Sequence, residues 1–230
     1  MSCYPCQLIT DVFILFPARL GRFLIHIWDS ILGRKRQFFF LWWGLDTSLL
    51  LLEIFGLAEW YELGNFLVKR NTRPLTEAES ALAVTIFGSE LIYRRIRIDE
   101  KAYLGPKKYR FCYVSFFTIN SWGKMRDDIL IHELVHIWQY QQYGASYIPR
   151  ALMAQRTPEG YNYGGVNRLR ETFNQQGNIR DFNFEQQADI VADYYRLHQN
   201  GQVRWGRAEA PDLHYYTYFV QQINPKLVQA

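Results

Sequence analysis

Residues 127–143, with the sequence DDILIHELVHIWQYQQY, decide most of what this chain can be. Apolar residues recur through this stretch at spacings of three and four, which predicts an α-helix. Asp127 and Asp128 suit the first turn, because carboxylates there satisfy free backbone N–H groups and complement the helix dipole. Gly144 suits the end of the helix. We therefore expect a helix over about residues 128–143.

The segment HELVH within this helix carries two histidines, His132 and His136, four residues apart. At that spacing both imidazole rings project from one face and can bind the same cation. Glu133 is rotated from them, beside the coordination position that the rings leave open. The pattern predicts a Zn²⁺ site at which Glu133 is the general base, taking a proton from water and passing it to a leaving amine. The alternative is a pair of helix-surface histidines without a metal.

A catalytic zinc needs a third protein ligand. Gln142, six residues after His136, stands where metzincins place their third histidine, which excludes that class. The segment NFEQQADIVADYY offers two carboxylates on one helix face, Glu185 and Asp189. We expect Glu185 to bind the metal and Asp189 to accept the free N–H of a ligand histidine. Two alternatives stay open: the reverse assignment, in which Asp189 is the ligand, and a solvated acidic face.

Catalysis by such a site also needs a hydrogen-bond donor for the developing oxyanion. The candidates are Tyr161, Tyr163, His198 and Tyr195, and a tyrosine of the Gly-rich loop is favoured over the other two. A tyrosine in such a loop is more commonly a packing residue, so that interpretation stands beside the catalytic one. Gln139, one turn beyond His136, is expected to support the site without acting in it.

The composition narrows the class of protein. The chain has 230 residues, a formal charge of +4 and basic residues spread along its length, so we expect no nucleic-acid partner. Three cysteines without framework spacing exclude a disulfide scaffold. The first apolar stretch contains Asp11, Arg19 and Arg22 and lacks a cleavage site for a signal peptide. We therefore expect a cytoplasmic or membrane-associated location, in preference to secretion by a classical signal peptide. The compartment itself stays unknown.

The N-terminal segment is the apolar part of the chain. Residues 7–32 fit an amphipathic helix interrupted at Pro17. A basic cluster, residues 34–36, precedes about twenty mostly apolar residues with a turn expected at residues 44–47. Three interpretations stay open: a transmembrane helix, an interfacial hairpin that binds a membrane surface through residues 7–60, and helices packed on the rest of the chain.

The remaining elements follow from local patterns. Thr76 and Glu79 form a capping box, so a helix begins there. We expect a linker at residues 71–74 and strands over residues 91–99 and 109–119. We also expect helices over about residues 183–198 and 211–223, with a loop flanked by short helices around residues 156–169.

Several segments together resemble a known family. TRPLTEAE, IFGSEL, HELVHIWQ and FEQQADIVADYY occur in the order found in metallopeptidases of the extracellular contractile injection system core-domain type, including bacterial proteins labelled Vgr-related. The resemblance covers about Arg73 to Leu197, and the spacing of Glu185 and Asp189 is similar to the gluzincin pattern. It implies a zincin-like fold, a peptidase, a ligand role for Glu185 and an orienting role for Asp189.

We therefore expect a mostly helical α+β chain. Residues 1–65 would form an apolar helical segment, and residues 66–230 a zincin-like domain with a short β-sheet. The expected activity is Zn²⁺-dependent hydrolysis of a peptide or protein substrate. One alternative is a zinc-stabilised structural or assembly module of a secretion or phage-tail-like apparatus. Another is a membrane-anchoring factor whose HELVH segment is incidental.

Overall fold

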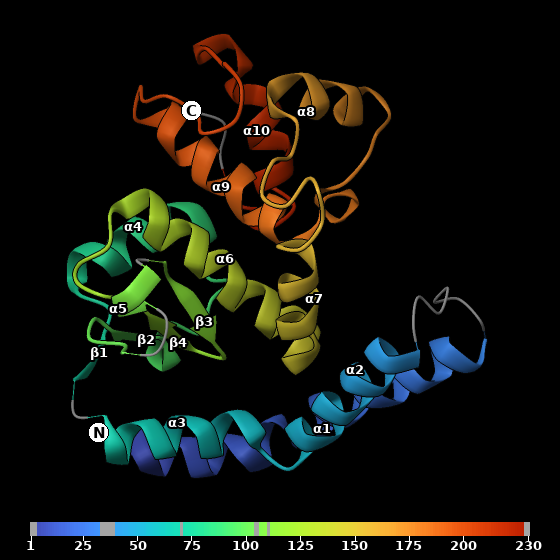
Figure 1. Ribbon diagram of the computed structural model, residues 1–230, viewed down its shortest axis with the longest axis vertical. Helices are drawn as coiled ribbons and strands as arrows, with labels where there is room; N and C mark the ends of the chain where they lie inside the picture. The colour runs from blue at the N-terminus through green and yellow to red at the C-terminus, as the bar shows by residue number, and fades with distance from the viewer. Residues whose placement is uncertain (1–3, 33–39, 70, 104–105, 110, 228–230) are drawn as a thin grey trace.

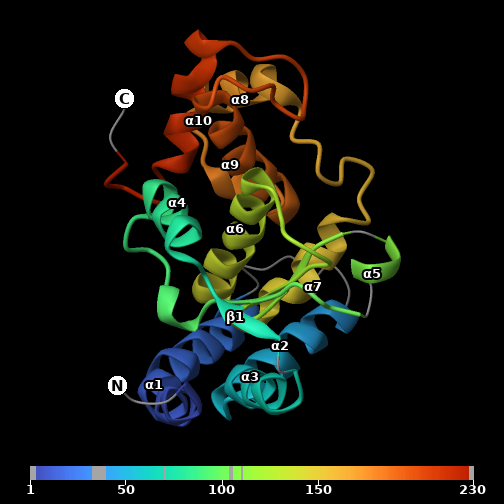
Figure 2. The same ribbon diagram turned by 90° about the vertical axis from the view of Figure 1, so that its left-hand side faces the viewer.

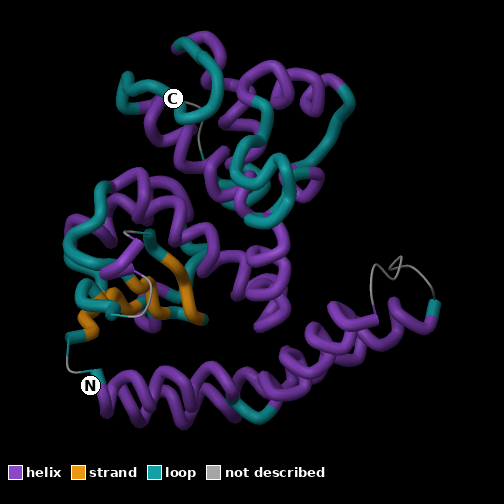
Figure 3. The backbone as a smooth tube through the Cα atoms, viewed as in Figure 1, coloured by secondary structure: helices purple, strands orange, loops and turns teal. Residues whose placement is uncertain are grey.

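The computed structural model describes residues 4–32, 40–69, 71–103, 106–109 and 111–227. The chain is mostly helical with one small mixed sheet, as expected for an α+β protein (Figures 1 and 3). The α-helices are α1 (Tyr4–Ile31), α2 (Phe40–Ile54), α3 (Leu57–Val68), α4 (Glu77–Phe87), α5 (Pro106–Tyr109), α6 (Asp127–Tyr143), α7 (Tyr147–Ala154), α8 (Gly165–Asn174), α9 (Phe184–His198) and α10 (Leu213–Val220). The 3₁₀ turns are η1 (Tyr93–Arg95), η2 (Gly144–Ser146), η3 (Ile179–Asp181) and η4 (Ala210–Asp212).

The sheet contains four short strands in the order β1-β2-β4-β3. They are β1 (Thr72–Pro74), β2 (Arg97–Asp99), β3 (Tyr113–Ser115) and β4 (Thr118–Asn120). The central pair β2 and β4 is parallel, whereas β1 and β3 are antiparallel to their neighbours. Strand β3 is hydrogen-bonded to β4 along one edge, and its other edge pairs with no strand among the described residues. Strand β3 also contacts helix α6.

Three predictions for the sheet region were wrong in detail. Of the strand expected over residues 91–99, only β2 is a strand, and η1 precedes it as a 3₁₀ turn. Residues 71–74, expected as a linker, contribute edge strand β1, because Arg73 pairs with Ile98. The single strand expected over residues 109–119 is a hairpin of β3 and β4, turning at Phe116 with a φ of 57°. A bulky residue in this left-handed region is uncommon. A continuous run of β-forming side chains therefore concealed the turn.

Helix α6 is the centre of the molecule. Every residue from Leu130 to Tyr140 is buried, because α4, the sheet and α9 pack around it (Figure 2). The predicted end is confirmed, since Gly144 closes the helix with a φ of 65°. Helix α9, which packs along α6, begins at the capping box of Asn183. The helix expected to begin at Thr76 has its predicted capping box.

Helices α1, α2 and α3 form a long N-terminal hairpin beneath the sheet (Figures 1 and 3). Helix α1 runs without interruption through Pro17, contrary to the prediction. Pro17 lies on the exposed face, and ion pairs of the buried side chains Asp11 and Arg19 hold the helix on either side of it. The turn expected at residues 44–47 falls at Gly56, which has a φ of 82°. The basic cluster at residues 34–36 lies outside the described residues.

The hairpin is joined to the rest of the chain by buried charged groups. The Glu59 carboxylate accepts hydrogen bonds from Arg19 at 2.7 Å and Arg95 at 2.5 Å. The Glu53 carboxylate accepts the backbone N–H of Ala145 at 2.8 Å, immediately beyond the end of α6. A Cβ on Gly144 would lie 2.2 Å from Glu53 Oε2, so only glycine leaves room for this contact. The hairpin thus packs directly against the end of the HELVH helix.

No single helix among the described residues is both long and apolar enough to cross a bilayer. Taken together, Leu41–Ile54 and Leu57–Val68 are long and apolar enough to cross a bilayer, although the two helices meet at a 70° bend.

Candidate metal centre

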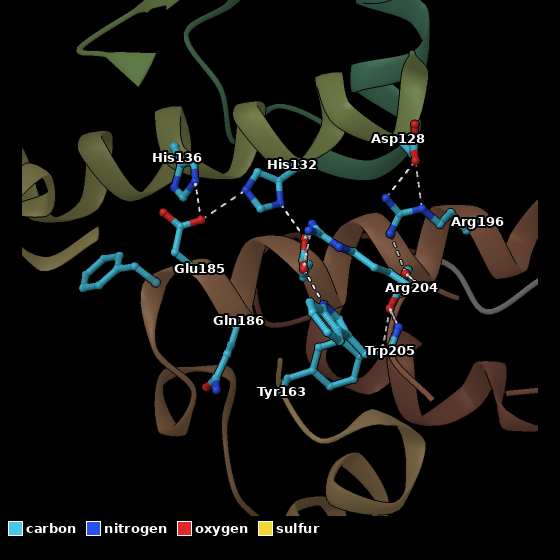
Figure 4. Close-up of polar contacts among 12 residues, drawn as sticks. Asp128, His132, His136, Tyr163, Glu185, Gln186, Arg196, Arg204 and Trp205 are labelled. Atoms are coloured by element: carbon cyan, nitrogen blue, oxygen red, sulfur yellow. Dashed lines mark hydrogen bonds and ion pairs between the residues drawn. The ribbon is translucent and has the colours of Figure 1, made fainter. Parts of the chain in front are cut away.

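The structure brings the three predicted ligands together. Helix α6 supplies His132 and His136, and the first turn of α9 supplies Glu185, whose carboxylate lies between the two rings (Figure 4). Glu185 Oε2 is 3.3 Å from Nε2 of each histidine, and one ligand atom of each residue lies within 4.8 Å of the others. The edges of a tetrahedron with bonds of about 2.0–2.1 Å are about 3.3–3.4 Å long, so the two distances from Glu185 to the histidines suit zinc.

Each histidine is oriented by a hydrogen bond at its other ring nitrogen. His132 Nδ1 lies 2.8 Å from Asp189 Oδ1, and His136 Nδ1 lies 2.8 Å from the side-chain oxygen of Gln139. Because both partners are acceptors, each Nδ1 donates its proton, and Nε2 is the atom that each ring turns toward Glu185. Lone pairs and a carboxylate converging on one point require a proton or a cation between them.

Residues from other parts of the chain hold these partners in place. Trp205 Nε1 donates to Asp189 Oδ2 at 2.5 Å, and Arg204 lies 3.3 Å from the same carboxylate. Gln155, which directly follows α7, donates to the second oxygen of Glu185 at 2.8 Å. Gln139 donates to the Phe184 carbonyl at 2.9 Å, which ties α6 to the start of α9.

The electrostatics of the cluster are dominated by its carboxylates. Burial alone would lower the pKa of His132, but its hydrogen bonds with Asp189 and Glu185 raise that pKa to about 10. Burial opposes ionisation of Glu185, yet the two histidines hold its pKa below the usual range. In the metal-free chain, protons on the imidazoles thus balance buried negative charge. A divalent cation would replace those protons, as metal binding to histidine does generally.

Glu133 lies beside this cluster and makes no comparable contact. Its side chain is buried, and Oε2 has no hydrogen-bond partner among the residues that the structure describes. Burial raises the pKa of Glu133, although His132 and His136 oppose that effect. An unpartnered buried carboxylate oxygen costs free energy, so it marks a position suited to a water molecule or a substrate.

A pocket of about 720 Å³ opens onto the cluster. Its walls come from β3, α6, α7, the following loop and α9, and it includes both histidines, Glu133 and Glu185. The apolar part of the lining includes Val114, Ile129, Ile148, Ala151 and Leu152. The pocket therefore combines a polar centre with apolar walls, as ligand sites commonly do.

Of the four candidate oxyanion donors, the structure brings Tyr161 to the pocket wall, its ring 6.0 Å from that of His132. Tyr163 lies elsewhere: its hydroxyl donates to Asp193 at 2.6 Å and contacts Tyr216. His198 is exposed at the end of α9 beside Tyr194. The hydroxyl of Tyr195 donates to Asp127 at 3.2 Å.

The contacts of Gln155, Arg204 and Trp205 were not predicted from the sequence. Arg204 and Trp205 belong to an irregular segment after α9, where no periodicity indicates which side chains turn inward. A local signal for their placement exists in Gly165, whose Cβ would lie 3.0 Å from the Trp205 carbonyl and whose φ is 67°. The close approach needs glycine at that position.

Comparison of this mostly helical α+β chain with known proteins finds a distant similarity to one secretion-system protein. No family model and no solved structure matches it. It is similar to the type VI secretion system spike protein VgrG2b of Pseudomonas aeruginosa strain PAO1, with 26% identity over 135 residues. The match covers 54% of this chain and 13% of the spike protein. This distant similarity supports the Vgr-related context of the sequence resemblance.

Proposed function

We propose that the chain is a zincin-like, zinc-dependent peptidase. The observation that carries this proposal is the position of Glu133: a buried carboxylate oxygen without a partner, beside two histidines and a glutamate whose donor atoms converge. A site built only for stability has no use for such a carboxylate, because leaving it unpartnered costs about 1–3 kcal/mol or more. A general base requires this arrangement before water and substrate bind.

His132, His136 and Glu185 would hold the metal, and Asp189 and Gln139 orient the two rings. When bound, zinc lowers the pKa of a water molecule and polarises a carbonyl group. Glu133 Oε2, which has no hydrogen-bond partner among the described residues, would accept a proton from a water molecule in the pocket and pass it to the leaving amine. Burial, which raises the pKa of Glu133, makes its carboxylate a better proton acceptor.

The substrate would be a peptide in extended conformation. The free edge of β3 borders the pocket through Tyr113, Val114 and Ser115, so its backbone groups are available to a further strand. One of them is already engaged, since the Tyr147 hydroxyl donates to the Val114 carbonyl at 2.5 Å. Apolar side chains on α7 then provide a surface for substrate side chains.

Tyr161 would donate the hydrogen bond that stabilises the oxyanion. It lines the pocket, and burial together with nearby carboxylates raises the pKa of its hydroxyl, so the group stays protonated. We expect Tyr161→Phe to lower kcat about 100-fold with zinc content unchanged.

The similarity to a spike protein favours a second candidate function, a zinc-stabilised structural or assembly module. Both functions use the same three ligands. They differ at Glu133, which the module does not need.

The test combines metal analysis with hydrolysis of a mixed peptide library. We expect about one zinc per chain in the wild type, loss of zinc in His136→Ala and Glu185→Ala, and retention of zinc in Glu133→Gln. Glu133→Gln should reduce kcat by about 10²–10⁴-fold. Glu171→Gln, which removes an exposed carboxylate from α8, is the matched control and should leave kcat unchanged. Zinc without hydrolysis would support the module, and a chain that binds no zinc would exclude both functions.

A further inference from the structure

The N-terminal hairpin carries most of the exposed apolar surface. Outside it, the exposed large hydrophobic side chains among the described residues are five: Val84, Tyr103, Phe111, Trp122 and Leu152. Those of the hairpin are Ile9, Phe13, Ile14, Phe16, Leu24, Ile25, Trp28, Ile31, Leu32, Leu41, Leu45, Leu51, Leu52, Phe55, Trp60, Phe66, Leu67 and Val68. We call this set the outer face. An apolar surface of this extent on a folded chain marks an interaction site.

The charged groups of the hairpin lie on its opposite side. Among the described residues of α1, α2 and α3, no acidic or basic side chain is exposed. Asp11 pairs with Arg94 at 2.9 Å, and Asp46 pairs with Arg150 at 3.0 Å. The hairpin is therefore inverted relative to a helix in water, which turns its charges outward and its apolar residues inward.

These ion pairs also fix the orientation of the hairpin. They occur along its whole length, from Asp11 near the start of α1 to Asp46 in α2, and the Glu59 pairs lie between them. The partners belong to the sheet region and to α7, so the charged side cannot rotate outward without breaking buried contacts. The outer face is held away from the rest of the molecule.

The chemistry of the outer face suits lipid better than protein. Protein interfaces have a polar rim and about one hydrogen bond per 100–200 Å². Here an uncharged face follows a helix of 28 residues, about 42 Å long at 1.5 Å per residue. Trp28 and Trp60, each 59% exposed, are the side chains that favour the headgroup region of a bilayer.

The hairpin would lie along the bilayer and not cross it. A crossing would move the ion pairs of its inner side into hydrocarbon, where charged groups are costly. An amphipathic hairpin lying in the interface buries only its apolar face and leaves the charged side in contact with the rest of the chain. We infer that the outer face of α1, α2 and α3 binds the surface of a lipid bilayer and holds the pocket-bearing part of the chain beside it.

The experiment is flotation of the purified full chain with phosphatidylcholine vesicles, whose zwitterionic headgroups match the uncharged face. We expect the wild type to float with the vesicles. The variant F13E/L24E/L52E places three charges on the outer face and should bind at least about 100-fold more weakly, because three apolar contacts with the bilayer are replaced by charged groups. The control V84E/Y103E/W122E alters three similarly exposed side chains elsewhere and should float like the wild type.

Depth is measured by quenching with brominated lipids. Most of the tryptophan fluorescence that brominated lipids quench in the wild type should come from Trp28 and Trp60. The quenched signal should therefore be much smaller in the variants Trp28→Phe and Trp60→Phe. Zinc content and hydrolysis of soluble peptides should be equal in both triple variants, so failure here and failure of the proposed peptidase are separate results. A wild-type chain that stays monomeric without vesicles and does not float would overturn the inference. So would a stable dimer dissociated by F13E/L24E/L52E, which would assign the outer face to a second copy.

Discussion

Replacing Asp189 by Asn tests whether the cluster is organised for a metal. Asp189 accepts hydrogen bonds from His132 Nδ1 at 2.8 Å and from Trp205 Nε1 at 2.5 Å. An amide has only one oxygen for these two donors, and it removes the negative charge that makes the imidazole a stronger ligand. Loss of such a partner lowers metal affinity by about 10- to 100-fold, or about 1.4–2.7 kcal/mol. We expect that reduction for zinc, measured by competition with a chromophoric chelator.

Asp193→Asn is the matched control. Asp193 lies one turn further along α9 and is equally buried. It accepts hydrogen bonds from Arg196, from Tyr163 and from the backbone N–H groups of Arg204 and Trp205 without touching either histidine. We expect this variant to unfold at a lower temperature but to bind zinc like the wild type. Equal zinc affinity in Asp189→Asn and the wild type, or an equal loss in both variants, would refute the reasoning.

Three further outcomes concern the hairpin. Glu59→Gln removes the carboxylate that two buried arginines share, so chemical denaturation should show that the free energy of unfolding falls by about 3 kcal/mol. An unchanged denaturation midpoint would contradict this. Burial raises the pKa of Glu62 to about 7, above its unfolded value near 4.5. The contribution of protonated Glu62 to the free energy of unfolding is therefore present below pH 4.5 and is lost as the pH rises through 7. Glu62→Gln should remove this loss, which is measured by comparing chemical denaturation at pH 5 and pH 8. Gly144→Ala places a methyl group against Glu53 and should lower the melting temperature, whereas Gly123→Ala, at a similar φ in open space, should do so less.

The sequence was most informative where a pattern repeats within one helix. The spacing of His132 and His136, and that of Glu185 and Asp189, are local properties, and any α-helix places each pair on one face. Tertiary packing then had only to bring two helices together. The donors on Asp189 could not be predicted in this way, because Trp205 reaches it from an irregular segment.

Predictions based on a single helix-breaking or turn-forming residue were less successful. Pro17 was expected to interrupt α1, but contacts on both sides of it outweigh the lost hydrogen bond, about 3 kcal/mol in a helix interior. Gly44 was expected to begin a turn, yet the chain bends at Gly56, where Val12 packs against the glycine. The turn at Phe116 was not predicted, because no residue typical of turns stands at that position in the sequence. These three outcomes depend on contacts distant in the sequence.

The buried ion pairs of the hairpin also constrain the order in which the chain can fold during synthesis. Val68, the last residue of α3, is made well before Arg94, Ala145 and Arg150, which complete the charged side. At about 5–20 residues per second, the ribosome needs roughly 4–16 s to add that stretch. Throughout this interval the first helices have neither their charge partners nor a cover for their apolar side chains. We therefore expect the nascent N-terminal segment to be a strong client for chaperones until residue 150 has emerged.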